Sequence, residues 1–132
     1  MAAFMDYTSN FLIDWVVGRT TPAAVSTRYL TASDTSLPGG TEQMTAMTGS
    51  ANRVALTPAT YFTSAAATHA IASTADITFT ASSSGSATVA FVSMWTAITG
   101  GSQMTQAAVT SKSLTAGDSL KILSGNLTFN IT

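Results

Sequence analysis

The chain has no cysteine, a single histidine and few charged residues. Its 132 residues include five lysines or arginines and six aspartates or glutamates, so that 8% are charged, against about 25% in an average soluble protein. Without cysteine the chain can form no disulfide, thiolate nucleophile or thiolate metal site. The net charge of −1 and the scattered cations provide no basic patch for a phosphate backbone, so we do not expect nucleic acid as a partner.

Long apolar runs are also absent. The mean hydropathy is +0.30, but no run approaches the roughly 18 apolar residues that a membrane-spanning helix needs. The longest apolar block near the N-terminus, Phe11–Val17, is split by Asp14 and has no basic residue ahead of it, so we predict no signal peptide. We expect no membrane partner.

Motifs for catalysis or cofactor binding are missing as well. His69 lies in an Ala/Thr-rich stretch with no acidic residue closer than Asp76, which favours an exposed histidine over a catalytic or metal-binding one. No serine lies in a Gly-x-Ser-x-Gly elbow, and a hydrolase triad would need that single histidine. The glycines form no phosphate-binding loop, and six acids make a glycosidase pair improbable. We therefore expect no enzyme activity, no cofactor and no metal site.

Hydroxyl side chains and short apolar segments dominate what is present. Serine and threonine supply roughly three residues in ten, and the branched Cβ of threonine favours strands. After Pro22, short apolar segments alternate with Gly, Pro, Asn and Ser turns, which predicts β structure. The predicted strands are Ala24–Thr31, Arg53–Thr57, Ala75–Ala81, Thr88–Thr96, Gln103–Thr110, Ser119–Leu123 and Leu127–Ile131.

The segment Thr88–Thr96 is the best candidate for a core strand. Apolar side chains occupy both of its faces, which is typical of a central strand covered on both sides. Strict alternation predicts Val89, Phe91 and Trp95 on one face and Ala90, Val92 and Met94 on the other.

The last predicted strand alternates strictly between apolar and polar residues. Leu127, Phe129 and Ile131 are expected to face inward, which indicates a strand with one wet face. The turn residues 124–126 precede it, and we predict that they fold the last two strands into an antiparallel hairpin.

The N-terminal segment Ala2–Val17 has helical spacing, and Gly18 is placed to end the helix. Its polar stripe, Asp6, Asn10 and Asp14, is narrow, and its second half is apolar on nearly every side. We expect such a helix to need two partners, its own domain and a further protein surface.

Seven short strands with turn signals about every ten residues favour a mainly β fold. We predict an antiparallel β-sandwich or jelly-roll-like domain preceded by an N-terminal amphipathic helix. The length fits a single domain over residues 1–132, with a helix or arm over 1–20 and the sandwich over 21–132. The connection Ser33–Asn52 exceeds the roughly 12 to 15 residues of an ordinary loop, so we predict a contact loop there.

The segment Leu114–Ile122, followed by Ser124–Phe129, resembles a family of short phage virion proteins, many of which are labelled tail fibre proteins. The likeness extends over nearly the whole chain. It includes Leu12-Ile13-Asp14 in the N-terminal helix, the strand Val25–Thr31 and the loop Gly39–Glu42. The chain departs from the family pattern at two places. Ala51-Asn52 replace a Tyr-Ala pair before Arg53, and Ser86-Ala87 replace a Trp-Gly pair.

The resemblance implies a structural subunit of a virion. The leading interpretation is a capsid decoration, or cement, protein on the outer surface of the head, made in the host cytoplasm. Its expected partners are itself, with a trimer favoured, and the major capsid protein. The alternative is a tail or tail-fibre component, although no heptads or fibre repeats occur. A further alternative is a carbohydrate-binding β-sandwich, for which Tyr61, Phe62 and Trp95 could provide a platform.

A charge-poor surface suits assembly, because few charges lose their water on docking. Strand edges without lysine gatekeepers also favour association. For the aromatic residues of the helix, ordinary core packing is an equally good explanation. The expected contact residues are Phe4, Phe11 and Trp15 in the N-terminal segment and Glu42, Met44 and Met47 in the long loop.

Overall fold

The computed structural model describes residues 3–4, 6–21, 27–40, 42–43, 53–63, 70–79 and 86–130. All the strand pairings among them are antiparallel, which confirms the predicted mainly β fold with a helix near its N-terminus. The elements are β1 (Ala3–Phe4), α1 (Asp6–Val16), β2 (Arg28–Ser33), β3 (Val54–Leu56), α3 (Pro58–Tyr61), β4 (Ala70–Ala72), β5 (Ile77–Phe79), β6 (Ala87–Trp95), β7 (Gln103–Leu114), β8 (Leu120–Ile122) and β9 (Thr128–Asn130).

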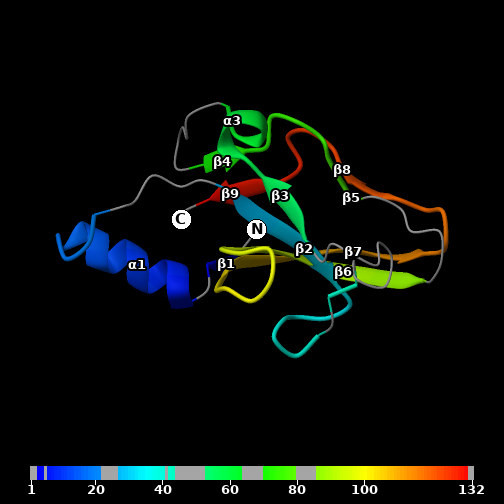
Figure 1. Ribbon diagram of the computed structural model, residues 1–132, viewed down its shortest axis with the longest axis horizontal. Coiled ribbons are helices and arrows are strands. Elements are labelled where there is room, and N and C mark those ends of the chain that lie inside the picture. Colours follow the sequence, from blue (N-terminus) through cyan, green and yellow to red (C-terminus); the bar gives the residue numbers. More distant parts are fainter. Residues whose placement is uncertain are drawn as a thin grey trace.

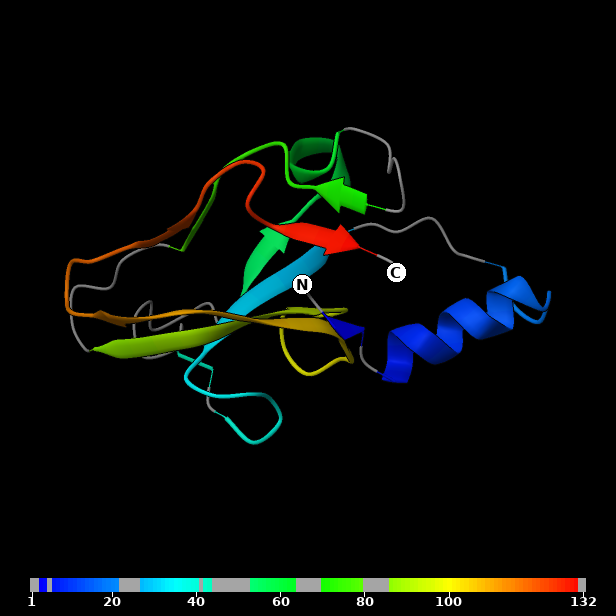
Figure 2. The ribbon, with the colours of Figure 1, turned by 180° about the vertical axis from the view of Figure 1, so that it is seen from behind.

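The described strands form two layers. One layer is a five-stranded sheet in the order β1-β7-β6-β2-β3, and the pairs β4-β9 and β5-β8 lie over it (Figure 2). The jelly-roll form is not confirmed, because the described strands make one five-stranded sheet and two pairs instead of two matched sheets. Between the layers lies one core, built from Leu30, Ala32, Leu56, Ile77, Phe79, Ala87, Val89, Val92, Met94, Leu114 and Leu127.

Strand β6 lies inside the five-stranded sheet, between β7 and β2, as expected for the best core strand. The predicted faces are correct only in part. Val92 and Met94 lie together in the core, as predicted, but Val89 lies there with them, whereas strict alternation would have separated it from Val92. The pairing with β7 is irregular at this point, because Val89 pairs with Lys112 but Phe91 pairs with Ala108.

The second face of this sheet is covered by a polar layer. Thr31, Ser33 and Ser93 are fully buried there. The segment that follows β2 is held against this face, because the backbone N–H of Leu37 donates to Oε1 of Gln106 over 2.8 Å. Strand β6 is thus enclosed by an apolar core on one side and by hydrogen-bonded loops on the other.

The predicted C-terminal hairpin is wrong, because β8 pairs with β5 and β9 pairs with β4. The turn itself forms, since the N–H of Asn126 donates to the carbonyl of Leu123 over 3.0 Å. Its neighbours are bound to the β4–β5 connection instead of to each other, as in the 2.7 Å bond from Gly125 N–H to the Ser73 carbonyl. The segments 70–79 and 120–130 therefore run side by side as one interrupted antiparallel ribbon. Strand β4, which was not predicted, belongs to this ribbon.

The helix α1 begins later than predicted. Ala3 and Phe4 pair with Gln106 and Thr105 of β7 as a short strand, and the helix starts at Asp6. The helix ends where predicted: Gly18 adopts a φ of 77°, a conformation that glycine reaches without steric cost.

Candidate assembly surface

The helix α1 carries most of its large apolar side chains on its outside. Thr8 is its buried residue, whereas the exposed fractions of the apolar side chains run from 37% for Phe11 to 78% for Val16. Figure 1 shows α1 extending away from the two β layers at the β1 end of the molecule. The exposed members are Tyr7, Phe11, Ile13, Trp15, Val16 and, directly after the helix, Val17. We call these six residues the apolar helix surface.

Few contacts hold α1 to its own domain. The hydroxyl of Thr8 donates to the carbonyl of Met104 in β7 over 2.9 Å, and β1 fixes the start of the helix. Near the other end, Arg19 Nε lies 3.5 Å from Asp14 Oδ1, and both side chains are exposed. The sequence predicts that this helix has more apolar surface than its own domain can cover. The exposure of Phe11 and Trp15 agrees with that prediction.

The predicted contact residue Glu42 has an internal role. It forms an ion pair with Arg53, with 2.6 Å between Glu42 Oε1 and Arg53 NH2, and the arginine side chain is only 4% exposed. The same guanidinium donates to the carbonyls of Ala97 and Gly100 over 2.7 Å each. It also stacks on Trp95, at 4.0 Å from the ring centroid. This cluster fastens two loops to the polar face of the sheet.

Other predicted contact residues are described less fully or not at all. Phe4 lies in β1, where its backbone pairs with Thr105. Met44 and Met47 lie outside the described residues, as does His69.

The three aromatics of the carbohydrate-binding alternative do not form one exposed platform. Tyr61 and Phe62 are partly buried against the core. Trp95 is covered on one face by the Arg53 guanidinium and donates its ring N–H to Ser93 Oγ over 2.9 Å. These contacts explain the three rings by packing.

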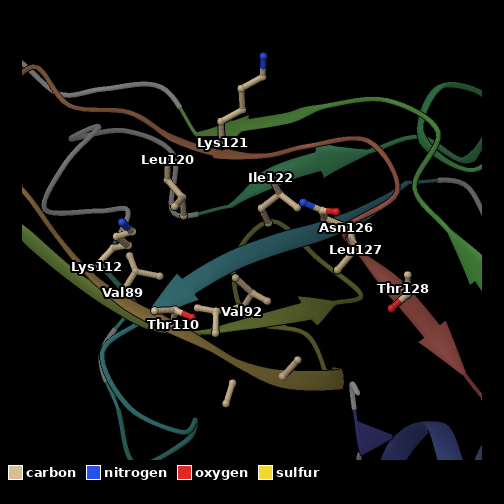
Figure 3. A pocket seen from close by; sticks show the side chains of 13 residues that line it. Val89, Val92, Thr110, Lys112, Leu120, Lys121, Ile122, Asn126, Leu127 and Thr128 are labelled. Carbon is tan, nitrogen blue, oxygen red and sulfur yellow. The ribbon is translucent and has the colours of Figure 1, made fainter.

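An open groove of about 520 Å³ lies between the two β layers, on the side of β7 and β8. Figure 3 shows Leu120, Ile122 and Leu127 pointing from the upper layer toward Val89 and Val92 of the lower one. We call this space the β7–β8 groove. Its lining is Val89, Val92, Ala107, Ala108, Val109, Thr110, Lys112, Leu120, Lys121, Ile122, Asn126, Leu127 and Thr128. The groove was not predicted, because it depends on strand pairings that the residue pattern does not specify.

Two carboxylates stabilise exposed turns near this groove. Asp76 lies 2.7 Å from Lys121 Nζ and accepts the backbone N–H of Ser124, and these two bonds hold the pKa of Asp76 below its ordinary value. The pKa of Asp118 is lowered in the same way, by hydrogen bonds from the backbone N–H and the hydroxyl of Thr115.

In the part of the chain that the structure describes, no three His, Cys, Asp or Glu side chains come together as a metal ion would require. Nor does any helix there combine the length and apolar character needed to cross a membrane.

One comparison with known proteins identifies a phage protein family. A family model described as "Podophage GP4 fiber I protein gp80" matches residues 3–130. The match confirms the resemblance to a phage virion family. No curated protein sequence matches the chain.

Proposed function

We propose that this chain, which belongs to the podophage GP4 fiber I protein family, is a non-catalytic structural subunit of a phage tail fibre. As a family member it is a phage structural protein, and the family's fibre label supports the tail over the capsid surface. The sequence alone favours a location on the capsid surface, because the chain lacks fibre repeats. That absence weighs less than a family match over nearly the whole chain.

The observation that carries the structural role is the apolar helix surface. Exposed apolar patches on soluble proteins mark interaction sites, and here six large side chains gather on one short helix and the residue after it. Burying such surface contributes about 25 cal/mol per Å², and part of that gain offsets the entropy lost on association. A subunit that is always assembled keeps this surface out of water.

The proposed partner is a further copy of the same chain, and the trimer expected from the sequence is the proposed stoichiometry. Charge supports self-association, because a net charge of −1 produces little repulsion between copies. A contact with the major capsid protein belongs to the capsid alternative.

The location is tested by separating virion parts. We expect mass spectrometry to detect the chain in purified tails and not in empty heads of the phage that encodes it. Quantification against a head protein and a tail protein controls for cross-contamination. Recovery with heads alone would contradict the proposal and restore the capsid interpretation.

A further inference from the structure

We propose that the apolar helix surface of one copy docks into the β7–β8 groove of the next copy, so that the chain assembles head to tail. This inference rests on the proposed structural function and specifies what covers α1. It concerns two surfaces of the same chain, one that projects and one that is hollowed.

The groove reaches the open side of the sandwich. Among the described strands, none pairs with β7 beyond Gln106 on the side away from β6, and β8 pairs with β5 alone. Four consecutive residues of β7, Ala107 to Thr110, line the groove together with consecutive residues of β8. Because neighbouring side chains in a strand point to opposite faces, such consecutive lining means that the groove opens at the strand edge.

The lining of the groove is incomplete as a core. Val89 and Val92 of β6 form an apolar floor. The neighbouring strand β7 contributes only small side chains to this floor, those of Ala107 and Ala108. The next five residues of β7, from Val109 to Ser113, are all exposed. The sandwich is thus closed by large side chains at its centre and is open along this side.

The projecting helix suits such a groove in shape. Phe11 and Trp15 are four residues apart, so they lie on the same face of α1, about 6 Å apart along the axis. An amphipathic helix that places anchors at this spacing in an apolar groove is a recurring mode of recognition. The volume of about 520 Å³ falls in the range of roughly 300 to 1,000 Å³ that encloses whole ligands, which leaves room for two aromatic side chains.

Charge favours this pairing over helix-to-helix packing. The acidic residues of α1 are Asp6 and Asp14, and the charged residues that line the groove are Lys112 and Lys121. Among the described residues Lys112 has no acidic partner, whereas Lys121 is bound to Asp76. Asp14 is already paired with Arg19, so Asp6 is the carboxylate of α1 that can pair with Lys112, whereas helix-to-helix packing offers Asp6 no such cation.

Within one molecule, the helix and the β8 side of the groove lie apart. Figures 1 and 2 both show α1 at one end and the β5–β8 pair at the other. A contact between different surfaces of identical chains is heterologous, and it closes into a ring or continues as a filament. A ring of three would satisfy the trimer expected from the sequence.

The decisive experiment mixes two defective variants of the full chain. The helix variant is Phe11→Ser with Trp15→Ser, and the groove variant is Thr110→Glu. Each alone loses one of the two surfaces, so we expect self-association to weaken about tenfold or more. Mixed in equal amounts, they retain one intact helix and one intact groove, and native mass spectrometry should show one-to-one heterodimers that grow no further.

Matched controls separate docking from folding. Ser111→Glu adds the same charge to the neighbouring exposed position of β7, which does not line the groove, and Asn10→Ser changes an exposed polar position of α1. Both controls should assemble like the original chain. All variants should keep the same unfolding midpoint, measured by circular dichroism.

Cross-linking supplies a second readout, because the chain contains no cysteine. Tyr7 lies four residues before Phe11, on the same helix face, and is 45% exposed. Tyr7→Cys and Thr110→Cys, mixed under mild oxidation, should form a mixed disulfide dimer, with little homodimer of either. Homodimers of Tyr7→Cys alone would instead indicate helix-to-helix packing.

Every other outcome overturns the inference in an identifiable way. If only the helix variant fails to assemble and mixing gives no heterodimer, α1 packs against α1, and the proposed structural function stands. If only the groove variant fails, another segment fills the groove. If the unaltered chain is monomeric throughout, both the inference and the proposed self-assembly fail.

Discussion

The β-sandwich and the helix α1 use apolar residues in opposite ways. In the sandwich, Leu30, Leu56 and Phe79 are at most 1% exposed. In the helix, Ile13 is 61% and Val16 is 78% exposed. Both regions come from the same charge-poor sequence, so composition alone does not explain the difference. No residue of α1 belongs to the buried core cluster, so the apolar residues of the helix are available for contacts between molecules.

The charged residues repeat this contrast. The Arg53–Glu42 pair is largely buried, and Arg53 holds two loop carbonyls and one aromatic ring. The Arg19–Asp14 pair on the helix is exposed, and a pair of this kind contributes little to stability. In the sandwich, a buried cation thus holds loops in place, whereas the ion pair of α1 is exposed and contributes little to its stability.

The largest expected effect comes from the core. Phe79→Ala should lower the free energy of unfolding by about 3 to 5 kcal/mol, because it leaves a cavity where the side chain was fully buried. Urea denaturation of dilute protein measures this loss. Trp15→Ala is the matched aromatic truncation on the helix, and it should change the unfolding free energy by no more than about 0.5 kcal/mol. Similar losses for both variants would remove the distinction between the two regions.

A smaller loss is expected from the buried ion pair. Arg53→Met should cost about 3 kcal/mol, because it removes the cation that pairs with Glu42 and the donor to two loop carbonyls. The same urea titration measures it. Adding Glu42→Leu to this variant should recover part of the loss, since no unpaired carboxylate then remains. A double variant as unstable as the sum of both single variants would contradict this explanation.

The smallest expected effect is a loss of stability at acidic pH. The folded pKa values of Asp76 and Asp118 are lowered by their hydrogen bonds, whereas unfolded aspartate titrates at about 3.9. The two ionised carboxylates therefore contribute fully to the free energy of unfolding above that pH. This contribution is lost as the pH falls through the lower pKa values of the folded state. Thermal unfolding followed from neutral pH to below pH 4 should show this decline. It should be weaker in Asp76→Asn with Asp118→Asn, and an identical decline in both proteins would be contrary to expectation.

Much of the sandwich could be predicted from the sequence, because local patterns determine its strands. The alternation around Leu127 and Phe129 identified an inward-facing strand, and Gly18 was correctly expected to end the helix. Strand β4 was missed because Ala70–Ala72 has little apolar contrast with its surroundings. The C-terminal hairpin was wrong because a turn signal specifies a local reversal and not which segment pairs with which.

The candidate site was predictable only in part. The surplus of apolar residues in α1 is a property of helical periodicity, and that periodicity alone indicates a second partner for Phe11 and Trp15. The role of Glu42 depends on Arg53, which is close only after folding. The groove depends on the irregular pairing of β6 with β7 and on edges of β7 and β8 that have no strand partner among the described residues, and neither feature leaves a residue pattern.

The central claim is that the apolar helix surface is covered by another copy of the chain. Sedimentation velocity at micromolar concentration tests it most directly, on the unaltered chain and on the Phe11→Ser, Trp15→Ser variant. We predict that the unaltered chain sediments as an oligomer and the variant as a folded monomer with the same unfolding midpoint. An unaltered chain that sediments as a monomer, or a variant that still assembles, would contradict the claim.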